Sequence, residues 1–244
     1  MKKILAVTLI CTMSAFAAWD KFPVIEHGKG EAKFSWETGS QGSKPLGESD
    51  EFYGIRFSPI ADLEFAAFAN DNYTLGLRYQ IISVLSAGVD VSFPLPGAYW
   101  SFTPSIQFSM PLTSALTLGS NFEATINTAG EYVNSYYEKE TKGIDATAGI
   151  ELDFALNEKN TVWISCDLIK GLTRTKQDDE KISRKTEGRG LGIYPALGYL
   201  ITLGNLELGT YLKLGFGEDA SYNGKYAISD EISTVTGIDA AIKF

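Results

Sequence analysis

Histidine is almost absent from this sequence, since His27 is the single one among 244 residues. Enzymes that use histidine as a base place it beside a serine or an acidic partner, and no such partner stands at an informative spacing from His27. Histidine-based catalysis is therefore excluded. We predict that the protein is not an enzyme and that it has no catalytic residue, no cofactor and no metal site.

Long apolar runs and basic residues are also scarce. Beyond residue 17, no apolar run approaches the ~18 residues that a helical membrane span needs. A membrane-embedded chain would therefore have to be a closed barrel, because only helices and closed barrels satisfy their backbone groups in lipid. Lys and Arg total 21 against 30 for Asp and Glu, a net charge of -9. A chain this acidic is not expected to bind nucleic acid.

The first 17 residues have the features of an export signal. Lys2 and Lys3 precede an apolar run of 10 residues, Ile4 to Met13, and Ala15-Phe16-Ala17 offers a small-x-small cleavage site. We predict a signal peptide over residues 1–17 and a periplasmic lead-in over residues 18–30.

Cysteine is the next scarcity. Cys11 lies inside the predicted signal, and Ile10 stands before it, where a lipid-attachment motif needs a small residue. Cleavage leaves Cys166 alone, so no internal disulfide is expected. It also removes two lysines, which takes the formal charge from -9 to -11 (-9 - 2).

From Glu31 to the C-terminus, apolar residues alternate with polar ones, which is typical of strands with two different faces. Turn residues separate twelve such stretches, at 31–38, 51–58, 62–69, 73–81, 85–93, 98–109, 115–127, 142–154, 161–169, 189–201, 205–216 and 232–244. Segments of about ten residues with this repeat are typical of transmembrane barrels, although soluble sandwiches also alternate.

The lengths of the connections separate these two folds. The connections after even-numbered stretches are short, and the long polar ones follow odd-numbered stretches, at 39–50, 128–141, 170–188 and 217–231. An up-and-down barrel with a periplasmic N-terminus predicts this parity, and a Greek-key sandwich predicts no such rule. We predict an all-β, up-and-down antiparallel transmembrane β-barrel of about twelve strands over residues 31–244.

Two features leave details of this assignment open. The first three stretches are short and less apolar, so ten strands is the alternative. Pro104 and Pro195 lie inside predicted strands, although a closed barrel has no edge strand that tolerates a missing N–H. Each proline is expected to mark a bulge or a shifted strand boundary.

The last stretch ends on an aromatic residue at the C-terminus. Its apolar face carries Ile238, Ala240, Ile242 and Phe244. It resembles the closing strand of bacterial outer-membrane β-barrels, a class-level resemblance over roughly residues 31–244. In that class the terminal aromatic residue belongs to the signal that the barrel-insertion machinery reads. The resemblance implies that this machinery, outer-membrane lipid and lipopolysaccharide are partners. With an even strand count, it implies an outer-membrane location with both termini periplasmic, and it leaves the oligomeric state open.

The inward faces predict the chemistry of the lumen. The acids there are Glu31, Glu37, Glu64, Asp90, Glu123, Asp145, Glu151, Asp153, Asp167, Glu207 and Asp239, and the bases are Lys33, Arg56, Arg78, Lys213 and Lys243. Eleven acids against five bases favour cations. Barrels of eight strands are filled and those of sixteen are open. We predict a narrow passive channel for small hydrophilic or cationic solutes. The alternative is a structural or adhesion barrel, plugged by paired charges, long loops or the lead-in, whose outer loops bind envelope or external partners.

Three of these charges are expected to be in contact. Arg56 and Glu64 flank one short turn, and Arg78 lies at a similar height on the next strand. Because adjacent strands are ~4.8 Å apart, Glu64 is predicted to accept hydrogen bonds from both guanidinium groups. Among the outer connections, 170–188 is rich in Lys and Arg, and it is either a lipopolysaccharide contact or a solvated loop.

Overall fold

The computed structural model describes residues 21, 24–41, 44–69, 72–94, 100–133, 137–171, 174–179, 182–187, 191–217, 221–222 and 232–244. Within these ranges no helix is both long enough and apolar enough to cross a membrane. The predicted signal peptide lies outside the described residues, as does most of the outer connection 217–231.

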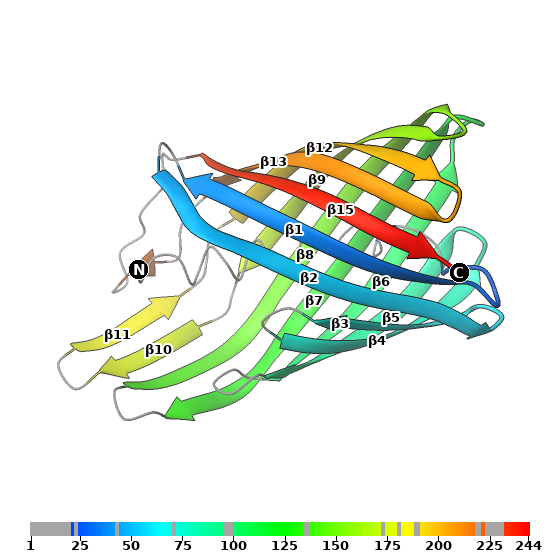
Figure 1. The fold of residues 1–244 in the computed structure, drawn as a ribbon. Coiled ribbons are helices and arrows are strands. Elements are labelled where there is room, and N and C mark those ends of the chain that lie inside the picture. The colour runs from blue at the N-terminus through cyan, green and yellow to red at the C-terminus, as the bar shows by residue number, and fades with distance from the viewer. Residues whose placement is uncertain are drawn as a thin grey trace.

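Nearly all of the described chain is in β-strands (Figure 1). The strands are β1 (Gly30–Gln41), β2 (Lys44–Ile60), β3 (Leu63–Ala69), β4 (Asn72–Ile82), β5 (Leu85–Pro94), β6 (Ser101–Pro111), β7 (Leu116–Val133), β8 (Tyr137–Asn157), β9 (Asn160–Gly171), β10 (Arg174–Asp179), β11 (Ile182–Glu187), β12 (Leu191–Leu203), β13 (Leu206–Gly217), β14 (Ser221–Tyr222) and β15 (Ser233–Lys243).

Twelve of these strands close into an antiparallel barrel, which confirms the predicted fold. Each of β1 to β8 pairs with the next strand in sequence, and β9, β12, β13 and β15 continue the wall. β15 then pairs with β1 from Glu31↔Lys243 to Gln41↔Ser233 and closes the ring. All twelve predicted stretches are barrel strands, so the ten-strand alternative is wrong.

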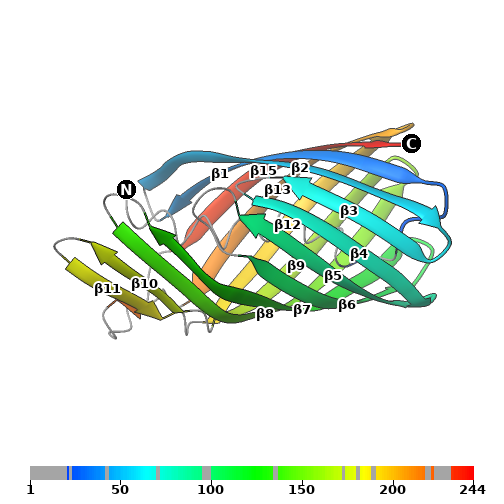
Figure 2. The ribbon, with the colours of Figure 1, turned by 90° about the horizontal axis from the view of Figure 1, so that it is seen from below.

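Short turns gather at one end of the barrel, which we call the turn end. They are residues 61–62, 83–84, 112–115, 158–159 and 204–205, and each joins an even-numbered barrel strand to the following one. The C-terminus lies at this end, and β10 and β11 lie at the opposite, loop end (Figures 1 and 2). The predicted parity of the connections is therefore correct.

Two long connections were predicted wrongly in their internal structure. Most residues of 39–50 and 128–141 extend β1, β2, β7 and β8 as paired strands. The backbone ladder continues outside the band of alternating residues, because hydrogen-bonded pairing does not need a lipid-facing side. The apolar repeat therefore marks where a strand faces lipid, not where the strand ends.

The predicted loop 170–188 also contains strands. β10 and β11 form a hairpin, and β10 pairs with the loop-end half of β8, from Tyr137 to Lys142. From Asp145 onward, β8 pairs with β9 instead. Gly143 lies between these two partners with a φ of 143°, a conformation that favours glycine.

The two prolines mark neither a bulge nor a boundary. Pro104 pairs in register with Val89 of β5, and Pro195 pairs in register with Cys166 of β9. The pairing of β6 with β7 has a gap at Pro104, and the pairing of β12 with β13 has a gap at Pro195. In both cases the register is the same before and after the gap. Because proline lacks an N–H, the ladder loses pairing locally without shifting.

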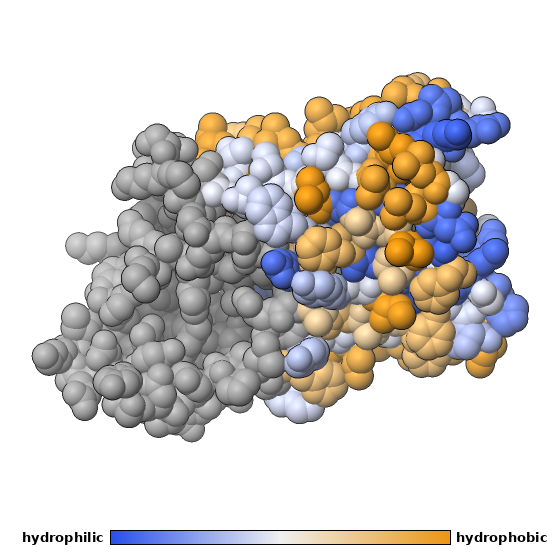
Figure 3. Space-filling model, viewed as in Figure 1, coloured by the Kyte–Doolittle hydropathy of each residue, from blue (hydrophilic) through white to orange (hydrophobic). Residues whose placement is uncertain are grey.

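The outer wall of the barrel is apolar, as a protein surface facing lipid must be. Hydrophobic residues recur along the described wall in Figure 3, and hydrophilic residues gather at the turn end. Aromatic pairs lie towards both ends of the wall. Phe57 and Phe65 stack at 5.8 Å near the turn end, and Phe93 and Trp100 meet edge to face at 4.6 Å near the loop end.

Candidate functional site: the barrel lumen

The lumen is lined by polar side chains that the barrel wall buries. Glu64, Gln107 and Ser86 are at most 1% exposed, although all three lie on membrane-spanning strands. Period-2 alternation produces this arrangement, since each apolar residue that faces lipid places its neighbours inward. The functional site of this fold is therefore its interior.

Of the charged residues predicted to face the lumen, all but Lys243 are buried or half-buried. The buried or half-buried ones include Arg56, Glu64, Arg78, Asp90, Glu123, Asp145, Glu151, Asp153, Asp167, Glu207, Lys213 and Asp239. The structure groups them into separate clusters. Asp239 binds Lys33 at 3.5 Å and accepts a hydrogen bond from Ser35 at 2.5 Å, and Glu207 binds Lys243 at 2.6 Å near the turn end.

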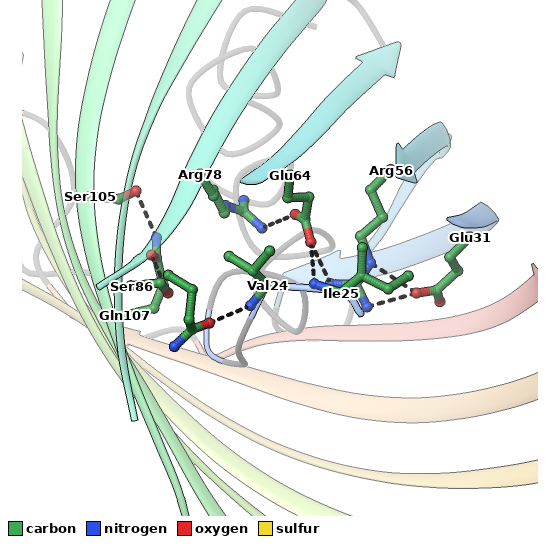
Figure 4. A network of polar contacts seen from close by, with 10 residues as sticks. Val24, Ile25, Glu31, Arg56, Glu64, Arg78, Ser86, Ser105 and Gln107 are labelled. Atoms are coloured by element: carbon green, nitrogen blue, oxygen red, sulfur yellow. Dashed lines mark hydrogen bonds and ion pairs between the residues drawn. The ribbon is translucent and has the colours of Figure 1, made fainter. Parts of the chain in front are cut away.

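Glu64 contacts both arginines as predicted, with a hydrogen bond from Arg78 but with an ion pair beyond hydrogen-bond distance to Arg56 (Figure 4). Arg78 Nη1 donates to Glu64 Oε1 at 3.3 Å, and Arg56 Nη1 lies 3.7 Å from Glu64 Oε2. The strand register explains why the Arg56–Glu64 distance is longer than the Arg78–Glu64 distance. Glu64 lies directly opposite Arg78, whereas Arg56 lies opposite Ala66, so the Arg56–Glu64 pair is diagonal.

Glu31 extends this chain of charges by one member. Arg56 donates to Glu31 Oε2 from Nε at 2.9 Å and from Nη2 at 2.7 Å, and the two residues are register partners across β1 and β2. Four alternating charges thus run from β1 to β4 near the turn end. Each carboxylate neutralises a neighbouring guanidinium, as buried charges require.

The lead-in, predicted as a periplasmic segment over residues 18–30, is described at residue 21 and from residue 24 onward. Its described part enters the lumen, where Ile25 N–H donates to Glu64 Oε2 at 2.9 Å and Val24 N–H donates to Gln80 Oε1 at 3.0 Å (Figure 4). Gly28 N–H donates to Ser58 O at 2.8 Å where the segment leaves the wall. The lumen carboxylate Glu64 therefore anchors both the wall and the lead-in.

Lys21 attaches the lead-in to the opposite wall. Its Nζ lies 2.7 Å from Asp167 Oδ1 and 3.9 Å from Glu151 Oε2, and the residue is 0% exposed. On one side of the barrel, β5, β6 and β7 separate the β3–β4 anchors from the β8–β9 anchor. Five barrel strands separate them on the other side, so the described residues of the lead-in contact two separate parts of the wall.

A third cluster combines charge with aromatic rings. Tyr211 donates a hydrogen bond to Glu37, whose carboxylate also lies 3.9 Å from Lys213 Nζ. The Tyr211 ring contacts Trp163 with 5.9 Å between centroids. The sequence pattern missed both aromatic side chains. Glycines on the neighbouring strands are the sequence feature that could have indicated them, because the Tyr211 ring covers Gly237 and the Trp163 ring covers Gly198.

Uncharged side chains on β5, β6 and β7 form hydrogen bonds with one another on the inner face of the wall. Ser86 donates to Gln107 at 3.1 Å, Gln107 donates to Ser105 at 2.7 Å, and Thr103 donates to Thr125 at 3.1 Å. Figure 4 shows the contacts among Ser86, Gln107 and Ser105.

The proposed assembly signal lies on the outer face of the closing strand. Ile238, Ile242 and Phe244 are 52%, 56% and 59% exposed, and Ala240 is half-buried on the same face. Phe244 also joins β1, because its backbone exchanges hydrogen bonds with Gly30 at 2.7 and 2.9 Å and its ring covers Gly30. The last residue of the predicted signal therefore also takes part in closing the barrel.

A family model described as a putative MetA-pathway of phenol degradation matches residues 34–227. The chain belongs to this family. The match spans the barrel from β1 to the outer connection after β13. A search of curated proteins finds no match to this member of the family.

Solved structures show that this family member has the fold of an outer-membrane channel. The COG4313 outer membrane channel from Pseudomonas putida F1 aligns with a TM-score of 0.57 at 9% identity, covering 91% of this chain and 98% of that one. The NanC porin aligns at 0.49 and 11%, covering 84% and 98%. The Escherichia coli outer membrane protease OmpT aligns at 0.46 and 7%, covering 89% and 97%. The alignment to the COG4313 channel therefore shows that the chain shares the fold of outer-membrane β-barrels.

Proposed function

We propose that this protein is a narrow passive channel of the outer membrane for small hydrophilic or cationic solutes, and that it does not act as an enzyme. One observation carries the proposal. A closed wall, apolar outside, encloses a lumen lined by charged and polar side chains from all parts of the barrel. A polar lumen inside an apolar wall gives a solute a path that lipid denies it.

Charge supports a preference for cations. The lumen predicted from sequence carries eleven acids and five bases, and the described lead-in adds the ammonium group of Lys21, which still leaves a surplus of acids. Low-dielectric walls focus the field of such a surplus along the pore. We further propose that the turn end, with both termini, faces the periplasm, because outer-membrane barrels carry their short turns on that side.

Single-channel recording of the refolded mature protein in a planar bilayer tests the proposal. We expect stepwise conductance, and in a salt gradient we expect a reversal potential that indicates cation preference. Anion preference would contradict the proposed selectivity. The same bilayer without protein, and with protein unfolded in detergent, provides the control for leakage.

A specific observation favours a second function. Lys21, Val24 and Ile25 tie the lead-in to both walls of the lumen, which is how a plugged structural barrel would be built. The absence of conductance steps in refolded protein that shows the folded band on gels would support this second function and contradict the channel.

A further inference from the structure

Lys21 occupies a site that the barrel wall builds for a cation. Its ammonium group lies 2.7 Å from Asp167 and 3.9 Å from Glu151, and the side chains of the two acids are each 5% exposed. The described residues thus enclose one alkylammonium group completely. A charge is stable in such surroundings only because opposite charges replace its water.

Gly149 provides the space for the alkyl stem. It pairs with Asp167 across β8 and β9, and a Cβ atom added to it would collide with Asp167 Oδ1, Asn121 Oδ1 and Lys21 Cε. Three groups from β7, β9 and the lead-in therefore converge over a position with no side chain. A wall residue larger than glycine would fill this space.

An unsatisfied acceptor points into the same space. Asn121 is 7% exposed, and its Oδ1 accepts no hydrogen bond from the residues that the structure describes. Its Nδ2 donates to Glu123 Oε1 at 2.8 Å, which fixes the orientation of the amide. A buried acceptor without a donor costs about 1–3 kcal/mol, so a ligand that brings N–H groups to this point gains from it.

Several acidic side chains surround Lys21. Lys21 interacts electrostatically with Glu123, Glu151 and Asp153, in addition to its contact with Asp167. Asp153 Oδ1 is itself buried without a hydrogen-bond partner among the described residues. An exchange of one monovalent ammonium for another therefore leaves the local balance of charge unchanged.

The other anchors of the lead-in do not involve Lys21. Val24 and Ile25 are anchored on β3 and β4 through their backbone N–H groups, and no bond of Lys21 contributes to those anchors. The side chain of Lys21 is thus a tethered ligand. A tether raises the local concentration of its group and reduces the apparent affinity of any free competitor.

We propose that the space over Gly149, lined by Asp167, Glu151 and Asn121, is a binding site for small primary alkylammonium solutes, which Lys21 occupies until a solute displaces it. This inference rests on the proposed channel for its role in transport, because it names the class of solute. The binding site itself does not depend on an open pore.

Isothermal titration of the refolded mature protein with n-butylammonium, at constant ionic strength, tests the site. We expect Lys21→Ala to bind the probe at least about tenfold more tightly than the unaltered protein, because the tethered competitor is gone. Adding Asp167→Asn to Lys21→Ala should abolish that binding. Lys243→Ala is the matched control, since Lys243 pairs with Glu207 near the turn end, at 2.6 Å, and the affinity of this variant for the probe should equal that of the unaltered protein.

Several outcomes would overturn the site. They are equal affinity in Lys21→Ala and the unaltered protein, equal binding of the neutral analogue butan-1-ol, or binding of Ca²⁺ with no response to the ammonium. Lys21→Gln provides the same comparison if Lys21→Ala does not fold. Conductance without binding contradicts the site alone, whereas binding to a barrel that never conducts contradicts the channel alone.

Discussion

Several polar contacts near the turn end converge on Glu64. It is 0% exposed, and it meets Arg78 at 3.3 Å, Arg56 at 3.7 Å and the N–H of Ile25 at 2.9 Å. It therefore joins three parts of the molecule: the β2–β3 hairpin, the neighbouring β4 and the lead-in.

Glu64→Gln should lower the stability of the folded barrel. The change keeps the volume and leaves two guanidinium groups with less neutralisation, and breaking a buried ion pair costs about 3–5 kcal/mol. We expect the temperature at which the folded gel band disappears to fall, and the cation preference of the pore to weaken.

Glu207→Gln is the matched control for that change. Glu207 pairs with Lys243 at 2.6 Å, but the Lys243 side chain is 48% exposed, and exposed pairs contribute only about 0.2–1 kcal/mol. Equal losses of stability in the two variants would contradict the role assigned to Glu64.

At the scale of elements, the strands could be predicted and the lead-in could not. Lipid on one side and a polar lumen on the other impose the period of 2, so the twelve strands and their faces were readable from sequence. Even Val235, which breaks the alternation of the last strand, is buried on the inward face. Strand ends beyond the lipid carry no such signal, which is why the extensions of β7 and β8 and the β10–β11 hairpin were missed.

The contacts of the lead-in leave no pattern in the sequence. Val24 and Ile25 bind the wall through backbone N–H groups, which every residue except proline possesses. The ladder from Arg56 to Arg78 was predictable because charged side chains at known heights on neighbouring strands have few other partners. The same reasoning could not place Lys21, because no strand register fixes its height.

Aromatic rings over glycines couple neighbouring strands in the wall. The Tyr211 ring of β13 covers Gly237 of β15, its register partner, and the hydroxyl of Tyr211 reaches Glu37 of β1. One ring thus spans the seam where the barrel closes. Covering a glycine with a neighbouring aromatic ring is a recognised way of stabilising a sheet.

Gly237→Val should displace this ring and weaken the seam. A Cβ atom at position 237 would overlap the Tyr211 ring, and overpacking of this kind costs about 1–3 kcal/mol. We expect a lower unfolding temperature of the folded band. Gly204→Ala is the control for general loss of glycine, since nothing lies within 4 Å of its added Cβ and its positive φ confines the penalty to the turn. A smaller effect at Gly237 than at Gly204 would contradict the coupling.

At the scale of the whole molecule, the two ends of the barrel differ in build. The turn end has connections of a few residues and holds the C-terminus, whereas the loop end carries the long strands β7 and β8 and the β10–β11 hairpin (Figures 1 and 2). When a barrel inserts from the periplasm, the long segments at its outer end must pass through the membrane. The short turns at the other end stay on the periplasmic side. The asymmetry therefore predicts a single orientation for every copy.

Cysteine labelling on intact cells checks that orientation. In a Cys166→Ala background, Gln177→Cys in β10 should react with a membrane-impermeant maleimide, because the loop end is predicted to face outward. Lys159→Cys should not react until the outer membrane is opened, since Lys159 is exposed in a short turn at the other end. Both cysteines should react in detergent extracts, which controls for access to each side chain. Labelling of position 159 and protection of position 177 on intact cells would mean that the barrel is inserted the other way round.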